Sequence, residues 1–395
     1  MTPEQLLNEA DRCVKCGLCL PECPTYQVLS NEADSPRGRI SLMQALAKGE
    51  LDLSSQIETH LDRCLGCRAC ESACPSGVKY SSLLDTSRTV ITHRRNGKPV
   101  FHWLLNQLAN PKRLGYLNKT YHTLQRTGLL TIIAKLPSAK LKRLLVLAKQ
   151  LVGTAPTEAG LYPADLPKGR LVQLFTGCVA TQVEQPLIQT SLTLLRSLGY
   201  AVEIPATQVC CGAMHRHNGF EAAAENYCMA NRAQTDKSLA QSLITLASAC
   251  HLELLEHQAS SVPVVSLVEF LLKLPANEFP PLKPFTGRVA LHTPCSASND
   301  HSFELLQKIP QAEIIELPDN KTCCGAAGSY MLTQPTLSIA LGRAKIEQLK
   351  ACRVDVLATS NTGCAIQFRQ LIEESGLPIQ VMHPVELINQ QREIK

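Results

Sequence analysis

Two short cysteine runs near the start of the chain constrain it more than any other feature. They read Cys13-x2-Cys16-x2-Cys19-x3-Cys23-Pro24 and Cys64-x2-Cys67-x2-Cys70-x3-Cys74-Pro75. Three thiolates spaced two residues apart can wrap one face of a metal centre, and the proline after the fourth cysteine turns that side chain away. Because both runs have the same spacing and both end in Cys-Pro, they indicate a pair of metal centres rather than chance.

This spacing is typical of the bacterial ferredoxins that hold two [4Fe–4S] clusters. In those proteins the fourth cysteine of each run binds the cluster of the other run. We therefore expect one cluster on Cys13, Cys16, Cys19 and Cys74, and the other on Cys64, Cys67, Cys70 and Cys23. Structural zinc is the alternative, and it fits less well because zinc sites usually take two separated cysteine pairs per ion.

The chain has 395 residues, enough for two or three domains with separate cores. Sixteen of its 18 cysteines fall in metal-type motifs, so we expect a reducing compartment in which thiolates stay available to iron. The start, Met1 to Gln5, lacks the basic and apolar regions of a secretory signal, and no stretch of 18 residues is apolar enough for a transmembrane helix. These features predict a cytoplasmic protein.

The 39 residues between the two runs, Thr25 to Arg63, make this a longer, helical version of the two-cluster domain. We expect helices over residues 3–12, after Ile40 and over residues 55–62. Arg37 and Arg39 allow two interpretations. Either they form ion pairs in a surface turn, or they lie beside an anionic cluster and raise its reduction potential.

Four stretches around these cysteines resemble a known family. They are Cys23-Pro24-Thr25-Tyr26, Ser35-Pro36-Arg37-Gly38-Arg39-Ile40, Asp62-Arg63-Cys64 and Cys74-Pro75-Ser76-Gly77-Val78. Together they resemble the iron–sulfur subunit of bacterial glycolate oxidase (glycolate dehydrogenase), and the resemblance runs the length of the chain. The cluster motifs are shared with the iron–sulfur subunits of lactate-utilisation complexes, anaerobic glycerol-3-phosphate dehydrogenase and heterodisulfide reductase. The Pro-Arg-Gly-Arg stretch favours the glycolate member.

The segment from Thr86 to Thr157 contains 13 Lys and Arg residues and no Asp or Glu. Its leucines recur with helical spacing, and Pro99, Pro111 and Pro137 divide it into several helices. A leucine face and a basic face on residues 138–152 allow three interpretations: a solvated linker that packs on the next domain, a docking face for an acidic partner, or peripheral contact with an anionic membrane. No recognition motif accompanies the charge, so we expect no nucleic-acid partner.

After a Gly- and Pro-rich linker over residues 153–169, the chain repeats itself. The first copy contains Phe175-Thr176-Gly177-Cys178, Cys210-Cys211-Gly212-Ala213 and Ala247-Ser248-Ala249-Cys250. The second contains His292-Thr293-Pro294-Cys295, Cys323-Cys324-Gly325-Ala326 and Asn361-Thr362-Gly363-Cys364. The cysteine offsets of 117, 113 and 114 residues are nearly constant, which indicates a duplicated domain.

Each copy alternates short apolar runs with helical stretches, the pattern of a parallel α/β unit. We expect strands at residues 171–175, 202–204, 243–247, 288–292, 314–317 and 354–359, and helices at 188–197, 221–237 and 339–351. The predicted fold is an α+β multidomain protein. It has a helical ferredoxin-type domain with two [4Fe–4S] clusters (residues 1–95), a basic helical segment and linker (96–168), and two pseudo-repeated α/β domains (169–284, the first copy, and 285–395, the second copy).

The repeat cysteines follow strand ends, so loops at one sheet edge can bring them together. Cys178, Cys210, Cys211 and Cys250 would form one set of four thiolates, and Cys295, Cys323, Cys324 and Cys364 another. The resemblance identifies the copies as cysteine-rich "CCG" domains, which in heterodisulfide-reductase-like relatives hold non-cubane clusters and end in Cys-x2-Cys. Here Glu253 and Gln367 stand where the fifth cysteine would be. A further cluster, zinc, one unoccupied copy, or buried thiols without metal all stay open.

Several single residues near the repeat motifs, or in the helices between them, have simpler expected roles. Cys228 and Cys352 lie in helical stretches and are expected in the core rather than as ligands. His215 and His217 follow the first Cys-Cys-Gly, and Ser329 and Tyr330 hold the equivalent place in the second copy; a structural role is the simpler expectation for each. His292 lies three residues before Cys295 and is a candidate hydrogen-bond donor to a cluster sulfur.

The sequence has no glycine-rich nucleotide or dinucleotide motif, so we expect no flavin on this chain. Oxidation of an alcohol carbon removes two electrons and needs a flavin or similar cofactor, which must come from a partner. We therefore expect an electron-transfer subunit of a flavin-dependent 2-hydroxy-acid (glycolate) oxidoreductase. It would relay electrons from an FAD-binding subunit through its two clusters to quinone or another acceptor. The alternative is a redox-active CCG site that itself reduces a disulfide or a small acceptor.

Overall fold

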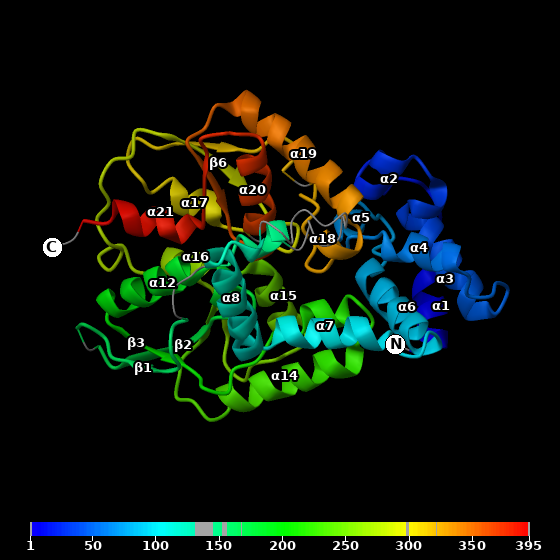
Figure 1. Ribbon diagram of the computed structural model, residues 1–395, viewed down its shortest axis with the longest axis horizontal. Coiled ribbons are helices and arrows are strands. Elements are labelled where there is room, and N and C mark those ends of the chain that lie inside the picture. The colour runs from blue at the N-terminus through cyan, green and yellow to red at the C-terminus, as the bar shows by residue number, and fades with distance from the viewer. Residues whose placement is uncertain are drawn as a thin grey trace.

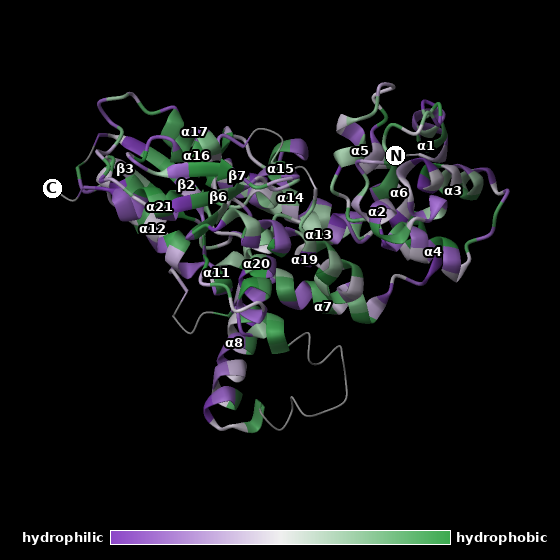
Figure 2. Cartoon of the chain, turned by 90° about the horizontal axis from the view of Figure 1, so that it is seen from above, coloured by the Kyte–Doolittle hydropathy of each residue, from purple (hydrophilic) through white to green (hydrophobic). Residues whose placement is uncertain are grey.

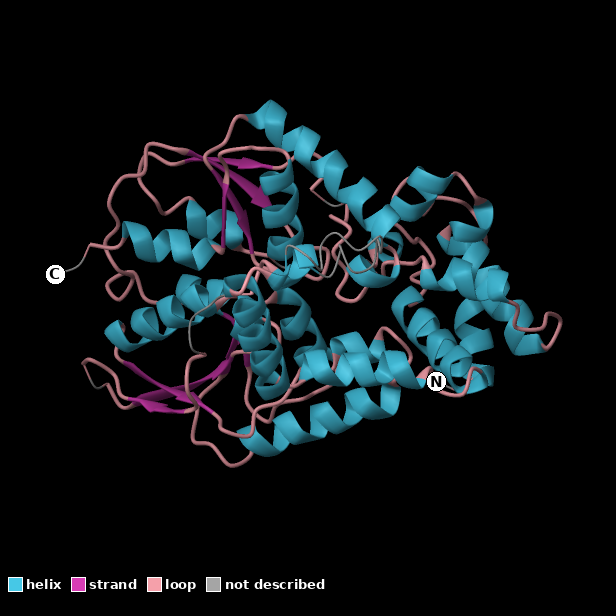
Figure 3. Cartoon of the chain, viewed as in Figure 1, coloured by secondary structure: helices cyan, strands magenta, loops and turns pink. Residues whose placement is uncertain are grey.

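The computed structural model describes residues 2–130, 145–151, 156–166, 168–297, 300–320 and 322–393. A helical N-terminal part lies at one end of the molecule, and the two α/β copies lie beside each other at the other end (Figure 1). Among the described residues, the strands belong to the two α/β copies, and the N-terminal part is built of helices and loops (Figure 3). The predicted class, a multidomain protein with a helical cluster domain and repeated α/β domains, is confirmed.

The N-terminal part consists of short helices joined by cysteine-bearing loops. They are α1 (Pro3–Ala10), α2 (Pro24–Leu29), the 3-10 helix η1 (Glu32–Asp34), α3 (Pro36–Lys48), α4 (Ser55–Asp62), α5 (Ala69–Ser72) and α6 (Tyr80–Arg94). Side chains of Thr2, Ser35 and Ser54 accept hydrogen bonds from the first turns of α1, α3 and α4. Leu61 and Leu83 are fully buried in the core of this part, where α4 and α6 pack together.

The basic segment begins with two helices that both start at a proline. They are α7 (Pro99–Ala109) and α8 (Pro111–Arg126), as expected from the proline positions. Helix α8 projects from the body of the molecule (Figure 2). Pro137 and most of the predicted helix over residues 138–152 lie outside the described residues. Among the residues that are described, no helix is both long enough and apolar enough to cross a bilayer.

The first copy forms a five-stranded sheet in the order β1-β3-β2-β4-β5. Its strands are β1 (Gly160–Tyr162), β2 (Arg170–Phe175), β3 (Tyr200–Ile204), β4 (Leu243–Thr245) and β5 (Val264–Ser266). Its helices are α11 (Ala180–Val183), α12 (Gln185–Ser197), α13 (Ala213–Arg216), α14 (Glu221–Thr235), α15 (Ser248–Glu256) and α16 (Leu267–Leu272). Strand β1 corrects the prediction of a plain linker over residues 153–169: it pairs antiparallel with β3 at the sheet edge, and its three residues are too few to give a sequence signal.

The second copy forms a four-stranded parallel sheet in the order β7-β6-β8-β9. Its strands are β6 (Arg288–His292), β7 (Glu313–Glu316), β8 (Val356–Thr359) and β9 (Gln380–Met382). Its helices are α17 (Ser302–Leu306), α18 (Tyr330–Thr333), α19 (Pro335–Cys352), α20 (Thr362–Glu374) and α21 (Pro384–Gln391). This order matches β3-β2-β4-β5 of the first copy, so the duplication read from the cysteine motifs extends to the sheet. The short strands β5 and β9 were not predicted.

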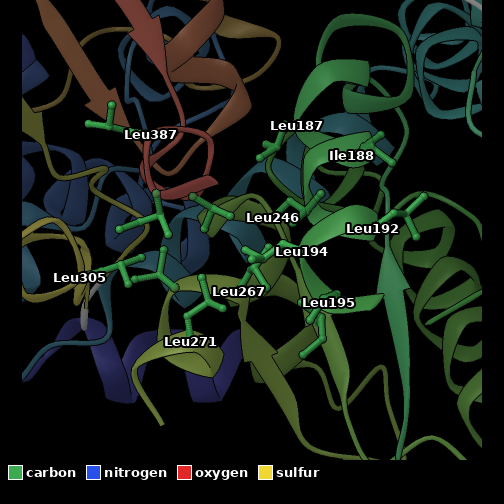
Figure 4. Close-up of a cluster of buried hydrophobic side chains, with 14 of the residues drawn as sticks. Leu187, Ile188, Leu192, Leu194, Leu195, Leu246, Leu267, Leu271, Leu305 and Leu387 are labelled. Atoms are coloured by element: carbon green, nitrogen blue, oxygen red, sulfur yellow. The ribbon is translucent and has the colours of Figure 1, made fainter. Parts of the chain in front are cut away.

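The two copies share one hydrophobic core. Leu194 and Leu246 of the first copy and Leu305 and Leu387 of the second belong to a single cluster of buried side chains (Figure 4). A bidentate ion pair between Arg369 and the nearly buried Glu184 also joins them, with N–O distances of 2.9 and 3.0 Å. The copies therefore form one packed unit, which fixes how their cysteines lie relative to each other.

Candidate metal centres

The first four-cysteine set lies around one cavity of the N-terminal part. Cys13, Cys16, Cys19 and Cys74 line a space of about 290 Å³. Gly17, with φ of +89°, lets the loop turn between Cys16 and Cys19, and the guanidinium of Arg37 lies where a larger residue would place its Cβ. The structure thus brings Cys74 from the second run to the three thiols of the first run.

The second set lies around a separate cavity of about 310 Å³. Cys23, Cys64, Cys67 and Cys70 line it, together with Arg39 and Tyr80. Cys23 comes from the first run and the other three from the second, so the fourth cysteines have exchanged places as the ferredoxin spacing predicts. Each cavity has four converging sulfur donors, and this donor set fits an iron–sulfur cluster.

The two cavities differ in exposure. Cys16 is exposed, and its neighbours Val14 and Leu18 are 69% and 58% exposed. Cys23 and Cys64 are buried, and burial raises the pKa of the Cys67 and Cys70 thiols well above the ordinary value. Cys16 of the first cavity is therefore the one exposed thiol among the eight N-terminal cysteines.

A buried cation borders the second cavity. The Arg39 side chain has no exposed surface, and one guanidinium nitrogen lies 4.0 Å from the Cys23 sulfur. Arg39 is held by an ion pair with Asp34 at 3.3 Å and by hydrogen bonds to Thr25 and to the His60 carbonyl. Its buried position beside a ligand thiol is the geometry in which a cation can act on a cluster.

Arg37 lines the first cavity and therefore combines features of both interpretations. It forms an ion pair with Glu32 at 2.7 Å, and both side chains are partly exposed. It also donates to the Lys15 carbonyl at 3.1 Å, which ties α3 to the loop around the first cavity.

Sequence analysis missed Tyr80 and Arg88 as neighbours of the second cavity. The Tyr80 hydroxyl lies 3.6 Å from the Cys64 sulfur, and Arg88 donates to the Cys64 carbonyl at 2.7 Å. Both lie on α6, 6 and 14 residues after Cys74, so the only signal available in the sequence was the helical spacing of α6.

The four thiols of the first copy come together at the carboxyl ends of its strands. The sulfur atoms of Cys178 and Cys210 are 3.4 Å apart, and Cys211 contacts both Cys210 and Cys250. The neighbouring thiols donate to Cys211 and lower its pKa well below the ordinary value, while the pKa of Cys210 is raised. All four cysteines predicted for this set are brought together.

The four thiols of the second copy converge in the same way. The sulfur atoms of Cys295 and Cys323 are 3.8 Å apart, and those of Cys324 and Cys364 lie within 4.8 Å of each other. The second copy also contacts the loop before Cys64, because the Tyr330 hydroxyl donates to the Arg63 carbonyl at 2.8 Å.

The residues at the fifth-cysteine positions serve the fold. Glu253 is 5% exposed and accepts from Arg216 at 2.7 Å. Gln367 is fully buried and donates to the Ser338 carbonyl at 2.9 Å. These contacts give both side chains a structural role in place of a fifth thiolate.

The two histidines after the first Cys-Cys-Gly have structural contacts. His215 is buried, its Nε2 lies 2.9 Å from the Asn106 amide oxygen, and burial lowers its pKa to about 4. His217 lies 3.2 Å from Asp85 and so connects the first copy to α6. Both fit the structural expectation.

The remaining single residues also make structural contacts. Ser329 hydrogen-bonds to Asn218 across the two copies, and Tyr330 donates to the Arg63 carbonyl. Cys228 is buried and donates to the His257 carbonyl, whereas Cys352 is partly exposed. His292 hydrogen-bonds to Thr359 and also faces thiols of the second copy.

Family models match both halves of the chain. The 4Fe-4S dicluster domain matches residues 9–78, and the cysteine-rich domain matches twice, at residues 172–255 and 289–369. The first match covers all eight N-terminal cysteines, and the paired matches cover all eight cysteines of the repeat. The chain therefore carries a two-cluster [4Fe–4S] domain followed by two cysteine-rich domains.

Three relatives illustrate the likeness along the chain. It is 30% identical to the probable glycolate oxidase iron-sulfur subunit of Bacillus subtilis, over 98% of this chain and 94% of that protein. It is 29% identical to the glycolate oxidase iron-sulfur subunit of Escherichia coli, over 96% and 94%. It is 25% identical to lactate utilization protein A of Geobacillus, over 55% of this chain and 98% of that protein.

Proposed function

Because this chain belongs to the family of glycolate oxidase iron–sulfur subunits, we propose that it is the electron-transfer subunit of a complex that oxidises a 2-hydroxy acid such as glycolate. The chain is a subunit of an oxidoreductase, and the substrate oxidation itself takes place on a partner. The observation that carries the proposal is the pair of four-cysteine cavities in the N-terminal part.

Each cavity has a defined set of proposed ligands. Cys13, Cys16, Cys19 and Cys74 would hold one [4Fe–4S] cluster, and Cys64, Cys67, Cys70 and Cys23 the other. Such a cluster accepts and gives up one electron at a time, whereas the oxidation of an alcohol carbon releases two. The chain's own residues hold the thiolates and place the Arg39 charge beside the second cavity.

The two-electron step calls for a flavin, which we assign to an FAD-binding partner subunit. The exposed loop around Cys16 supports exchange with that partner, because Val14 and Leu18 leave an apolar rim beside the first cavity. The second cavity has no exposed cysteine, and the loop before its Cys64 contacts Tyr330 of the second copy. Electrons would therefore enter near Cys16.

The onward acceptor is proposed to be quinone at the cytoplasmic face of the membrane. The basic segment supports this placement, since Trp103 is 62% exposed and the surrounding residues from Thr86 to Thr157 carry no acidic side chain. This contact would be peripheral, with the chain lying on the membrane surface.

Anaerobic reduction by substrate tests the proposed relay. The chain is purified with and without its flavin subunit, glycolate is added, and reduced clusters are detected by electron paramagnetic resonance. Glycolate is expected to reduce the clusters only when the flavin subunit is present. Reduction of the isolated chain by glycolate, or a reduced flavin subunit that leaves the clusters oxidised, would contradict the proposal. The Cys228→Ser variant is the matched control, because this buried thiol lies outside every cysteine set.

A further inference from the structure

The second copy has a group of metal-type side chains that the first copy lacks. Among the residues that the structure describes, His292, Cys324 and Cys364 are the one set of at least three His, Cys, Asp or Glu residues whose ligand atoms all lie within 4.8 Å of one another. All three are buried. The equivalent residue of the first copy is Phe175, three positions before Cys178 as His292 is three before Cys295.

The backbone places these side chains by the register of two parallel strands. His292 ends β6 and pairs with Thr359 at the end of β8, and the His292 Nδ1 lies 3.0 Å from the Thr359 hydroxyl. Metal-binding histidines commonly hydrogen-bond through the second ring nitrogen, which fixes the ring. With Nδ1 engaged by Thr359, Nε2 is the nitrogen able to bind a metal.

The thiols around His292 have donors that suit the thiolate form. The side-chain amide of Asn361 lies 3.4 Å from the Cys364 sulfur, and the backbone N–H of Gly325 lies 3.4 Å from the Cys323 sulfur. The first copy has Ala247 at the position of Asn361, so the amide donor is a second feature confined to the second copy.

A buried cation stands beside the same thiols. Lys345 is 2% exposed and donates to the Pro318 carbonyl at 3.3 Å. It lies on α19, where a Cβ at Gly342 would come within 3.4 Å of the Cys324 carbonyl. Three thiolates around a divalent ion carry one net negative charge. The Lys345 ammonium would offset that charge inside the core, where an uncompensated one is costly.

The distances favour a single ion over a cluster. A tetrahedral zinc ion with bonds of about 2.0 to 2.3 Å keeps its ligand atoms about 3.5 to 3.8 Å apart. The group lies within 4.8 Å, and a small contraction would close it. The thiolates of a cubane bind separate irons and lie farther apart, and neither N-terminal cysteine set has three sulfur atoms this close.

We propose that His292, Cys323, Cys324 and Cys364 bind a single zinc ion in the second copy, and that the first copy has no such site. Cys323 is the fourth ligand because it adjoins Cys324 in the chain, is buried, and has its sulfur 3.4 Å from the Gly325 N–H. Cys295 stays outside the set because it is exposed, whereas the four proposed ligands are buried. This inference does not depend on the proposed substrate or partner.

Metal content of the full chain tests the site. Zinc, iron and acid-labile sulfide are measured on anaerobically purified protein for the wild type and for the His292→Phe, Cys364→Ser, Cys295→Ser and Cys178→Ser variants. About one zinc per chain is expected in the wild type. His292→Phe and Cys364→Ser should lower zinc at least tenfold while the N-terminal iron is unchanged. Cys295→Ser and the first-copy variant Cys178→Ser should keep the zinc.

Zinc X-ray absorption of the wild type gives an independent reading in case a variant fails to fold. It should report three sulfur atoms and one nitrogen in the first shell. The proposal is overturned by a wild type without zinc, by additional iron and sulfide that persist in His292→Phe, by an all-sulfur shell, or by loss of zinc in Cys295→Ser or Cys178→Ser. Loss of N-terminal iron with zinc retained would count against the relay and leave the zinc site standing.

Discussion

The Tyr330 hydroxyl donates a hydrogen bond to the backbone carbonyl of Arg63, with 2.8 Å between the two oxygens. Arg63 directly precedes Cys64, and Tyr330 begins α18 of the second copy. Burial raises the pKa of the Tyr330 phenol, and the Cys64 and Cys323 thiols raise it further. One side chain therefore connects a ligand loop of the second cavity to the thiol set of the second copy.

Removing this hydroxyl should loosen the junction without unfolding either part. In Tyr330→Phe we expect a loss of about 1 kcal/mol at the contact, equivalent to about fivefold faster opening. Hydrogen–deuterium exchange of the backbone around Cys64 checks this. Tyr116→Phe is the control because Tyr116 is 70% exposed. Equal exchange in both variants would show that the hydrogen bond does not hold the junction.

The exchange of fourth cysteines predicts how double variants behave. Cys23→Ser and Cys64→Ser face the same cavity, so each alone should lose one cluster, and the pair together should lose no more than that cluster. Cys23→Ser combined with Cys16→Ser removes ligands from both cavities and should lose both clusters. Iron and sulfide per chain give the measurement. Pairing within each run would reverse the two results.

We expect substitutions of Arg39 and Arg37 to differ in their effects on the stability of the protein and on the reduction potential of the bound cluster. Arg39→Gln removes the buried cation from Asp34, which still pairs with Arg63 and His60, and is expected to lower the free energy of unfolding by about 1.5 to 3 kcal/mol. Where the protein still folds, loss of the cation should lower the reduction potential of the cluster bound at Cys23. Chemical denaturation and redox titration check the two effects.

Arg37→Gln is the comparison variant. It removes a partly exposed ion pair and should change stability by about 1 kcal/mol or less. If Arg39→Gln were as mild, the buried cation beside Cys23 would have no special role.

The buried His383 should make the free energy of unfolding sensitive to acid. It is buried, its Nδ1 accepts from the Val385 N–H at the start of α21, and burial lowers its pKa to about 4. The unfolded value is near 6.5, so the stability from neutral His383 is complete above about pH 6.5 and is lost as pH falls toward 4. The full effect is about 3 kcal/mol.

The His383→Asn variant isolates this contribution, because asparagine can cap the helix without titrating. We expect its denaturation midpoint to fall less than that of the wild type between pH 7 and pH 4.5. Parallel curves for the two proteins would assign the acid sensitivity to other groups.

The single tryptophan offers a direct probe of the proposed membrane contact. Trp103 lies on α7 in the basic segment and is 62% exposed. Vesicles that contain anionic lipid should shift its fluorescence to the blue, and salt should reverse the shift. Neutral vesicles are the control. An unchanged spectrum with anionic vesicles would contradict the membrane contact. The basic segment would then face a protein partner or solvent.

The sequence alone determined the features that depend on local spacing. The two runs from Cys13 and Cys64 specify four-sulfur sites because ligand spacing is set by a few neighbouring backbone angles. The constant offset from Cys178 to Cys295 gives the duplication, and the prolines at 99 and 111 give the starts of α7 and α8. Strands of three residues, such as β1 and β9, were missed because so short a run has no period of its own.

Only the tertiary structure decided what lies next to these sites. Arg37 and Arg39 are two residues apart and look alike in sequence, yet one is at the surface with Glu32 and the other is buried with Asp34. Likewise, His292 faces Cys324 and Cys364 because strand pairing and a turn of α20 bring them together across more than 30 residues of chain. Burial and long-range contact depend on how whole elements pack, and no local pattern contains that information.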